Sequence, residues 1–207
     1  MTKIAIIGLG NMGKGLARRL DGKVALFLGT RDIDSGQSFA VGFSQVPQVL
    51  SRQDAAAAAD LVVLALPYAS AIEFVRSTNL DGKVVVDLTN PLKEDFSGLL
   101  IGHSTSAAEE IQALALGARV VKAYNTIFAS LFDRPASDTA ATPVFLAGDD
   151  EAALASVTRL VEISGFSAEP TGGLGASRLV EPLGMLNIQL GYHQGRGTAI
   201  APAWQAL

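Results

Sequence analysis

A short apolar run followed by a glycine-rich loop opens the chain and constrains its fold more than any other feature. The run Ile4–Ile7 is predicted to form a β-strand, and it leads directly into Gly8-Leu9-Gly10-Asn11-Met12-Gly13, which matches the pattern G-x-G-x-x-G. The residues from Met12 to Leu20 then follow a helical pattern with one apolar side. A strand, a glycine loop and a helix in this order are typical of the first unit of a dinucleotide-binding fold.

Each glycine of the loop has a separate physical task in such a unit. Gly8 permits the tight turn, Gly10 lets the backbone approach a pyrophosphate, and Gly13 allows the helix to pack closely on the strand. The free N–H groups at the start of the helix then bind the phosphates. The alternative is an ordinary strand-to-helix turn that binds nothing, but the position inside a strand–helix–strand unit favours the dinucleotide.

The end of the second predicted strand indicates which dinucleotide is bound. NAD-binding units usually place Asp or Glu here to bond the ribose 2′-hydroxyl. This chain has Gly29 at that place, followed by Thr30 and Arg31, which can donate to a 2′-phosphate. The sequence therefore favours NADP(H). The alternative makes Arg31 a solvated loop residue and Asp32 the ribose ligand.

Strands and helices alternate along most of the chain, which predicts a doubly wound parallel α/β sheet, the Rossmann fold. Residues 1–171 are expected to form this NADP-binding domain, and residues 172–207 a small helical segment that closes the cleft. One apolar helix, from Ala176 to about Tyr192, dominates the segment and is expected to serve also as a homodimer surface. The strands are expected at Ile4–Ile7, Val24–Leu28, Leu61–Leu66, Val84–Leu88, Arg119–Ala123 and Val144–Ala147, and helices at Met12–Leu20, Gln53–Ala59, Ala69–Val75, Ala107–Leu116 and Glu151–Ile163.

Composition excludes several classes of function. The 207 residues are 49% hydrophobic with a net charge of −4 and no basic block, which argues against a nucleic-acid partner. There is no cysteine, and the two histidines, His103 and His193, belong to no cluster with metal-ligand spacing, so no metal is expected. No stretch is long and apolar enough for a membrane span, and a cytoplasmic protein is the expectation.

The order of these landmarks resembles that of the coenzyme F-420-dependent NADP oxidoreductases, which pass hydride between NADPH and a deazaflavin. The chain is also similar to the cytosolic domain of the STEAP metalloreductases. The resemblance covers essentially the whole chain. It rests on Gly8–Gly15, Gly29-Thr30-Arg31, Leu66-Pro67, Ser104–Glu109, Val120–Thr126, Gly148-Asp149-Asp150 and Ser177–Glu181.

The resemblance implies positions for both ligands. Leu9 to Met12 would hold the pyrophosphate, and Thr30 and Arg31 the 2′-phosphate. Leu66, Pro67 and Ser70 would lie beside the nicotinamide half, with Ala129 near its carboxamide. The acceptor would lie around Asn90, Pro91, Asn125, Thr126, Ile127 and the C-terminal helix.

Two positions depart from the family's pattern. Asp34 and Ser35 stand where some members carry a further basic residue, and Asn125 stands where the archaeal deazaflavin enzymes have histidine. The second departure leaves coenzyme F-420, FMN and FAD open as the acceptor.

The sequence offers few candidates for acid–base catalysis. Lys122, at the end of the strand before Asn125, is one possible proton donor, and the alternative is a lysine whose ammonium reaches solvent at a strand edge. Glu181 on the C-terminal helix is expected to be a paired or interfacial carboxylate, and the alternative is a carboxylate that lines the cleft. Hydride transfer to a flavin-type ring needs alignment of two rings and no side-chain acid, which favours a flavin-type small-molecule acceptor.

Two other functions stay open. One is an imine or β-hydroxyacid reductase of the pyrroline-carboxylate reductase type, although such enzymes carry a longer helical C-terminal domain. The other is a catalytically silent protein that binds NADP(H) as a sensor.

Overall fold

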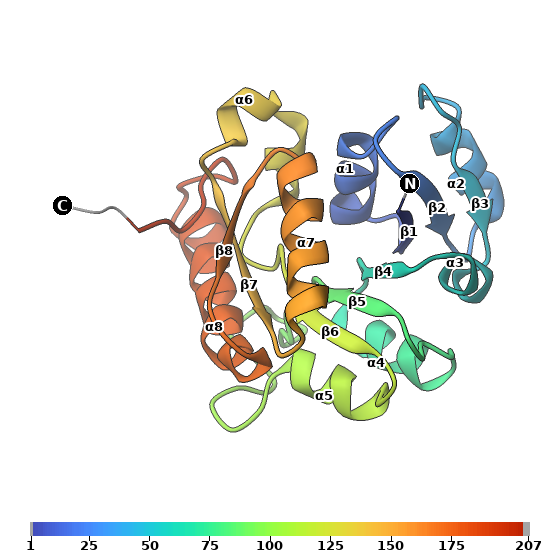
Figure 1. The fold of residues 1–207 in the computed structure, drawn as a ribbon. Helices are drawn as coiled ribbons and strands as arrows, with labels where there is room; N and C mark the ends of the chain where they lie inside the picture. The colour runs from blue at the N-terminus through green and yellow to red at the C-terminus, as the bar shows by residue number, and fades with distance from the viewer. Residues whose placement is uncertain (1, 205–207) are drawn as a thin grey trace.

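The computed structural model describes residues 2–204, and its strands form one eight-stranded sheet with the order β3-β2-β1-β4-β5-β6-β7-β8 (Figure 1). The order runs outward in both directions from β1, which is the doubly wound arrangement. The strands are β1 (Lys3–Ile7), β2 (Ala25–Gly29), β3 (Gln48–Leu50), β4 (Leu61–Leu64), β5 (Val84–Asp87), β6 (Arg119–Lys122), β7 (Pro143–Gly148) and β8 (Ser167–Pro170).

Helices cover both faces of the sheet. One apolar layer joins α1, α2, α7 and the 3-10 helix η1 to one face, and a second layer joins α3, α4 and α5 to the other. The predicted α/β fold class is confirmed. The α-helices are α1 (Asn11–Arg19), α2 (Ile33–Ala40), α3 (Arg52–Ala58), α4 (Tyr68–Arg76), α5 (Ala107–Leu114), α6 (Ala136–Thr139), α7 (Glu151–Ile163) and α8 (Ser177–Ile188). Shorter elements are η1 (Ala129–Asp133), η2 (Leu174–Ala176) and the π-helical turn η3 (Gln189–His193).

The sheet is parallel except between β6 and β7, which run antiparallel with Val121 opposite Gly148. Parallel neighbours need a long crossover, usually a helix that returns the chain across a face of the sheet. The connection from β6 to β7 contains only η1 and the four-residue α6. The chain therefore enters β7 at the same end of the sheet at which β6 finished. The expected parallel sheet is thus mostly but not entirely parallel.

Two strands absent from the sequence prediction, β3 and β8, lie at the two edges of the sheet. Both are short, and β8 has half-exposed and exposed residues along its length. An edge strand exposes part of its backbone and tolerates polar residues and proline, as Pro170 does here. These strands lack the continuous apolar run that identified the central ones.

Polar side chains cap the first turns of α5 and α7, and a glycine follows the end of α7. The hydroxyl of Ser106 accepts from the N–H of Glu109 at 3.2 Å and donates to its carboxylate at 2.7 Å. Asp150 caps α7 by accepting from the N–H of Ala153 at 2.7 Å, and Gly165 follows that helix at φ +86°.

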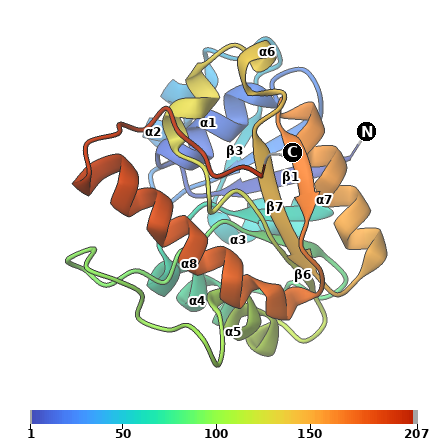
Figure 2. The ribbon, with the colours of Figure 1, turned by 90° about the vertical axis from the view of Figure 1, so that its left-hand side faces the viewer.

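Helix α8 packs on the face of β7 opposite α7 (Figure 2). Alternation along β7 explains how both faces are filled: Val144 and Leu146 belong to the apolar layer under α7, while Phe145 faces α8. No helix among residues 2–204 is long and apolar enough to cross a membrane.

Candidate cofactor and acceptor site

The glycine loop is closely packed at Gly8 and Gly13, as expected of the turn and of the helix contact. Gly8 has φ +101°, and a Cβ there would lie 2.5 Å from the carbonyl oxygen of Ala65. A Cβ at Gly13 would overlap the carbonyl oxygen of Gly8. Both positions therefore require glycine for the turn and for the contact between α1 and the sheet.

Gly10 differs from its two neighbours because it faces open space. A Cβ there would meet nothing within 4 Å. Gly10 is the residue before α1, no side chain caps that helix, and its first turn holds no acidic residue. Side chains do cap other helices, including Asp32 on α2 and Ser51 on α3. The start of α1 thus presents unpaired N–H groups and a positive dipole end to an anion.

The end of β2 has no room for the acid found in NAD-binding units. A Cβ at Gly29 would lie 2.7 Å from the side chain of Ile7 and 3.1 Å from Ala55. Thr30 is half-buried and Arg31 is exposed just beyond it. Asp32 caps α2, its carboxylate accepting from the N–H of Ser35 at 3.0 Å. This cap supplies a structural reason for Asp32 at that position.

A cavity of about 260 Å³ lies beside the glycine loop, between the ends of the central strands and α8. The structure brings seven predicted site residues together in its wall: Asn11, Met12, Asn90, Asn125, Thr126, Ile127 and Ala129. The expectation that the C-terminal helix borders the acceptor covers four more lining residues, which it did not name: Gly184, Asn187, Ile188 and Tyr192. Sequence reasoning missed the other three, which are Leu88, Tyr124 and Phe128.

Four further predicted residues do not line the cavity. Leu66 packs against the turn at Gly8. Pro67 precedes α4, and Ser70 is half-buried in the first turn of that helix. Pro91 is buried, and its carbonyl accepts from the N–H of Leu100 at 2.7 Å.

Hydrogen bonds fasten α8 to the wall of the cavity. The Asn125 NH₂ group donates to Oδ1 of Asn90 and to the carbonyl of Val180, each at 3.0 Å. The Asn90 NH₂ group donates to the backbone carbonyl of Asn125 at 2.8 Å. The Asn187 amide donates to the carbonyl of Thr126 at 3.0 Å. Gly184 permits the approach, since a Cβ there would lie 2.7 Å from the carbonyl oxygen of Asn125.

Two polar atoms in the wall have no partner among the described residues. They are Oδ1 of Asn125 and Oγ1 of Thr126, in side chains that are 5% and 1% exposed. A buried polar atom without a hydrogen bond costs about 1–3 kcal/mol. Both residues line the cavity, while the two atoms themselves are buried within its wall.

Tyr124 bends the chain at this place. It has φ +61°, although it is not glycine, and it is completely buried. Its hydroxyl is 3.1 Å from that of Ser164. Such a backbone conformation costs about 1–3 kcal/mol and occurs mainly at functional sites. It directs the next residues, Asn125 and Thr126, along the cavity wall.

Lys122 is fully buried, so the prediction of a lysine at a strand edge is wrong. Strand β6 lies inside the sheet, between β5 and β7. The ammonium lies 2.6 Å from Asp87 and 2.8 Å from Glu181, and it donates to the carbonyl of Thr89 at 2.7 Å. These oxygens surround the ammonium, and Lys122 does not line the cavity.

Glu181 is a paired carboxylate, as the sequence suggested. It accepts from the N–H groups of Ala107 and Ala108 in the first turn of α5, at 3.0 and 3.3 Å. Burial raises the pKa of Glu181, and the neighbouring Lys122 partly offsets that rise. Asp87, Lys122 and Glu181, here called the buried charge cluster, therefore join β5, β6, α5 and α8.

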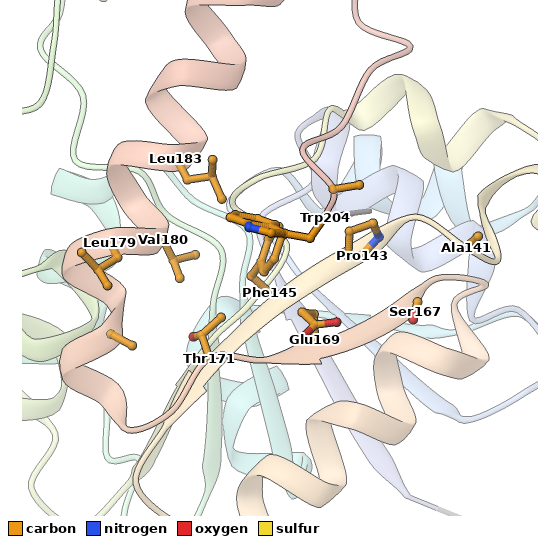
Figure 3. Close-up of a pocket in the computed structure, with 12 residues that line it drawn as sticks. Ala141, Pro143, Phe145, Ser167, Glu169, Thr171, Leu179, Val180, Leu183 and Trp204 are labelled. Atoms are coloured by element: carbon orange, nitrogen blue, oxygen red, sulfur yellow. The ribbon is translucent and has the colours of Figure 1, made fainter. Parts of the chain in front are cut away.

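A larger groove of about 660 Å³ lies elsewhere, on the side of β7 and β8 that faces α8 (Figure 3). Trp204 packs edge-on against Phe145 with the ring centres 5.3 Å apart. The groove shares no lining residue with the cavity beside the glycine loop. Within residues 2–204, no group of three or more His, Asp or Glu side chains could hold a metal ion.

Comparison with known proteins agrees with this geometry. Residues 3–91 match the family described as NADP oxidoreductase, coenzyme F-420-dependent. An F-420-dependent NADP reductase of Methanothermobacter thermautotrophicus is 32% identical, over 92% of this chain and 89% of that protein.

Solved structures give the same result. A structure from Arthrobacter sp. FB24, assigned as an F-420-dependent NADP reductase, superposes with a TM-score of 0.82 and 30% identity. That match covers 96% of this chain and 97% of the other. An imine reductase from Aspergillus terreus shares the fold at 21% identity and a TM-score of 0.69, over 94% of this chain and 63% of its own.

The fold and these relatives define an NADP-dependent oxidoreductase. Within that class, the chain belongs to the family of coenzyme F-420-dependent NADP oxidoreductases.

Proposed function

We propose that this oxidoreductase exchanges hydride between NADP(H) and a flavin-type acceptor, with coenzyme F-420 as the first candidate and FMN or FAD as the second. The observation that carries the proposal is the pair of unpartnered atoms on Asn125 and Thr126 in the cavity beside the glycine loop. A ring whose edge carries both N–H and C=O groups would pair with these two atoms once the two side chains rotate toward the cavity. The names of the relatives support the same acceptor class.

The cofactor would lie along the carboxyl ends of the strands. Gly8, Leu9, Gly10, Asn11, Met12 and Gly13 would hold the pyrophosphate at the start of α1. Thr30 and Arg31 would hold the 2′-phosphate at the end of β2. The open space at Gly10 and the full packing at Gly29 both support this placement.

The nicotinamide half would then extend toward the cavity. Leu66, Pro67 and Ser70 would border it on one side, with Ala129 near the carboxamide. Asn90, Pro91, Asn125, Thr126 and Ile127 would border the acceptor. Asn11, Met12 and Ala129 line the same cavity as the acceptor residues, so the two ligands could meet there.

The chain's own contribution to the reaction would be binding, alignment and the exclusion of water. NADPH, when bound, supplies a hydride that the acceptor takes up. No side-chain acid is required for that transfer, and the ammonium of Lys122 is held by Asp87, Glu181 and Thr89 away from the cavity. Asn90 and Asn125 would keep the acceptor ring at a fixed angle because they bond to each other and to α8.

The C-terminal segment, residues 172–207, would close this site and join two copies of the chain. Its helix α8 supplies Gly184, Asn187 and Ile188 to the cavity wall. The same helix exposes Leu179 and Leu186 on its outer side. We propose that these leucines form part of a homodimer interface.

The deciding experiment is anaerobic oxidation of NADPH with coenzyme F-420, FMN and FAD as separate acceptors, followed at 340 nm. We expect turnover with at least one of them, and faster turnover with NADPH than with NADH. A cyclic imine such as 1-pyrroline serves as the comparison substrate.

Two results would contradict the proposed reaction. Turnover of the imine without any flavin-type acceptor would indicate an imine reductase. Tight binding of NADPH without turnover of any acceptor would indicate a sensor.

A further inference from the structure

We propose that Arg52 is a second phosphate-binding arginine, which contacts the cofactor's 2′-phosphate from the chain after β3 while Arg31 contacts it from the chain after β2. This inference rests on the proposed binding of NADP(H) and adds a specificity-determining residue to it. Neither the pattern of the glycine loop nor the order of family landmarks includes Arg52.

The backbone places the two arginines just beyond the carboxyl ends of two neighbouring strands. Strands β2 and β3 are parallel, with Gly29 opposite Leu50, and the N–H of Thr30 bonds to the carbonyl of Leu50 at 3.1 Å. Arg31 follows Thr30, and Arg52 comes two residues after Leu50. Both residues therefore follow the carboxyl ends of neighbouring strands, where dinucleotide-binding folds hold the adenosine ribose.

Gly29 brings the backbone of Arg52 close to the end of β2. A Cβ at Gly29 would lie 3.3 Å from the Cα of Arg52. The glycine that stands in place of the ribose-binding acid thus has a second effect: it lets the chain at Arg52 pack directly beside the expected ribose.

The charges of the two arginines are not balanced by the protein. Among residues 2–204, neither Arg31 nor Arg52 forms a salt bridge, and Nε of Arg52 is buried without a hydrogen-bond partner. The pKa of Arg52 is lowered, first by burial and then by the nearby charge of Arg31, while Glu73 offsets part of that effect.

A phosphate monoester fits this arrangement. It carries up to two negative charges and three acceptor oxygens, and two guanidinium groups can approach it from two sides. Asp34 and Ser35, in the first turn of α2, offer no positive charge. The second cation at this site therefore comes from the first residue of α3, just after the neighbouring strand, and not from the continuation of the chain after Arg31.

The experiment is isothermal titration of the full-length protein with NADPH, NADH and 2′,5′-ADP. The variants are Arg52→Gln, Arg52→Lys and Arg31→Ala, and Arg159→Gln is the matched control because Arg159 is exposed on α7. Thermal melting of each variant checks that it folds.

We expect Arg52→Gln to weaken NADPH and 2′,5′-ADP by about tenfold or more, the lower range for a charge-assisted hydrogen bond. NADH affinity should stay unchanged, Arg52→Lys should retain part of the affinity for NADPH, and Arg159→Gln should behave as wild type.

The outcomes separate this inference from the proposed function. Equal affinity of the wild type for NADPH and NADH would remove the basis of both. A wild type that prefers NADPH, together with an unaffected Arg52→Gln variant, would overturn only the role of Arg52. An equal loss for NADPH and NADH in Arg52→Gln would also overturn it, because it would show stacking of Arg52 on the adenine.

Discussion

At the scale of single residues, the three glycines of the loop should respond differently to substitution. Gly8 and Gly13 are enclosed by backbone, whereas Gly10 faces open space. A methyl group at Gly10 costs the fold little, but it would stand where the pyrophosphate is expected to approach. The loop thus allows a test of binding that is separate from folding.

We expect Gly10→Ala to weaken NADPH binding at least tenfold (an order-of-magnitude figure for a lost charge-assisted contact) with a nearly unchanged melting temperature. Gly13→Ala is the contrasting variant and should destabilise the fold, since its Cβ would overlap the carbonyl of Gly8. Fluorescence titration and thermal melting measure the two effects. A Gly10→Ala protein that melts early and binds normally would show that the loop is only structural.

Arg31 provides the second test at this scale. Arg31→Ala removes one charge-assisted contact to the 2′-phosphate, so NADPH should bind about 10- to 150-fold more weakly. The dissociation constant for NADH should change little. Titration with both cofactors measures the difference, and an equal loss for both would assign Arg31 to a part of the cofactor that NADH shares.

At the scale of elements, the buried charge cluster holds four secondary-structure elements at the cavity. Lys122 on β6 contacts Asp87 at the end of β5 and Glu181 on α8, and Glu181 reaches the first turn of α5. A buried ion pair adds little net stability, but removing one partner leaves a charge uncompensated. We therefore expect the cluster to hold α8 in place and to contribute less to the chemistry of the site.

Replacing Lys122 alone should be costly for the fold. We expect Lys122→Met to lower the free energy of unfolding by about 3–5 kcal/mol, because it leaves two buried carboxylates without a cation. Adding Glu181→Gln should recover part of the loss. Urea unfolding measures both, with Lys93→Met at an exposed position as control. A stable Lys122→Met protein with kcat reduced a hundredfold would instead assign Lys122 to the transition state.

The raised pKa of Glu181 predicts a dependence of stability on pH. Its pKa in the folded chain lies above the ordinary value of 4.5, so the folded state binds the proton more tightly than the unfolded state. This contribution to stability is fully present below pH 4.5 and is lost as pH rises through the folded pKa. As pH rises from 4.5 through the folded pKa, the wild type should therefore lose stability relative to Glu181→Gln. Unfolding curves of the two proteins that stay parallel from pH 4 to 8 would contradict the shift.

At the scale of the whole molecule, α8 has a side toward the cavity and a side that is uncovered. Leu179 is 75% exposed and Leu186 is 52% exposed, and Trp204 is 76% exposed across the groove from Leu179. Large apolar side chains gathered on one surface are typical of protein interfaces. Most oligomers formed from one chain are symmetric dimers, in which the same surface of both copies is buried.

We expect the wild type to sediment as a dimer and Leu179→Glu to sediment as a monomer at the same micromolar concentration. A buried carboxylate without a partner is strongly unfavourable, which is the reason for the expected dissociation. Leu116→Glu is the control, since Leu116 is 86% exposed at the end of α5, away from this surface. A wild type that is monomeric throughout would remove the dimer from the proposal.

Part of the site could be predicted from the sequence because its signals are local. Gly8, Gly10 and Gly13 lie within six residues of each other, and an apolar run precedes them. The central strands are buried on both faces and appear as continuous apolar segments. Ser106 and Asp150 cap helices through residues only three positions away. Such features depend on neighbouring residues, so the sequence alone was enough to determine the fold class and to predict a cofactor end of the site.

The tertiary structure decided what depends on residues far apart in the chain. The partners of Lys122, at positions 87 and 181, come together only when β5, β6 and α8 pack. No local sequence pattern marks the left-handed backbone of Tyr124 or the close approach of Gly184 to Asn125. Strand β3 has no apolar pattern that would reveal it in the sequence. Its pairing with β2 brings Arg52 beside Arg31. Side-chain burial and charge proximity are properties of the packed chain, and therefore the hydrogen bonds within the cavity wall and the position of Arg52 beside Arg31 became visible only in the fold.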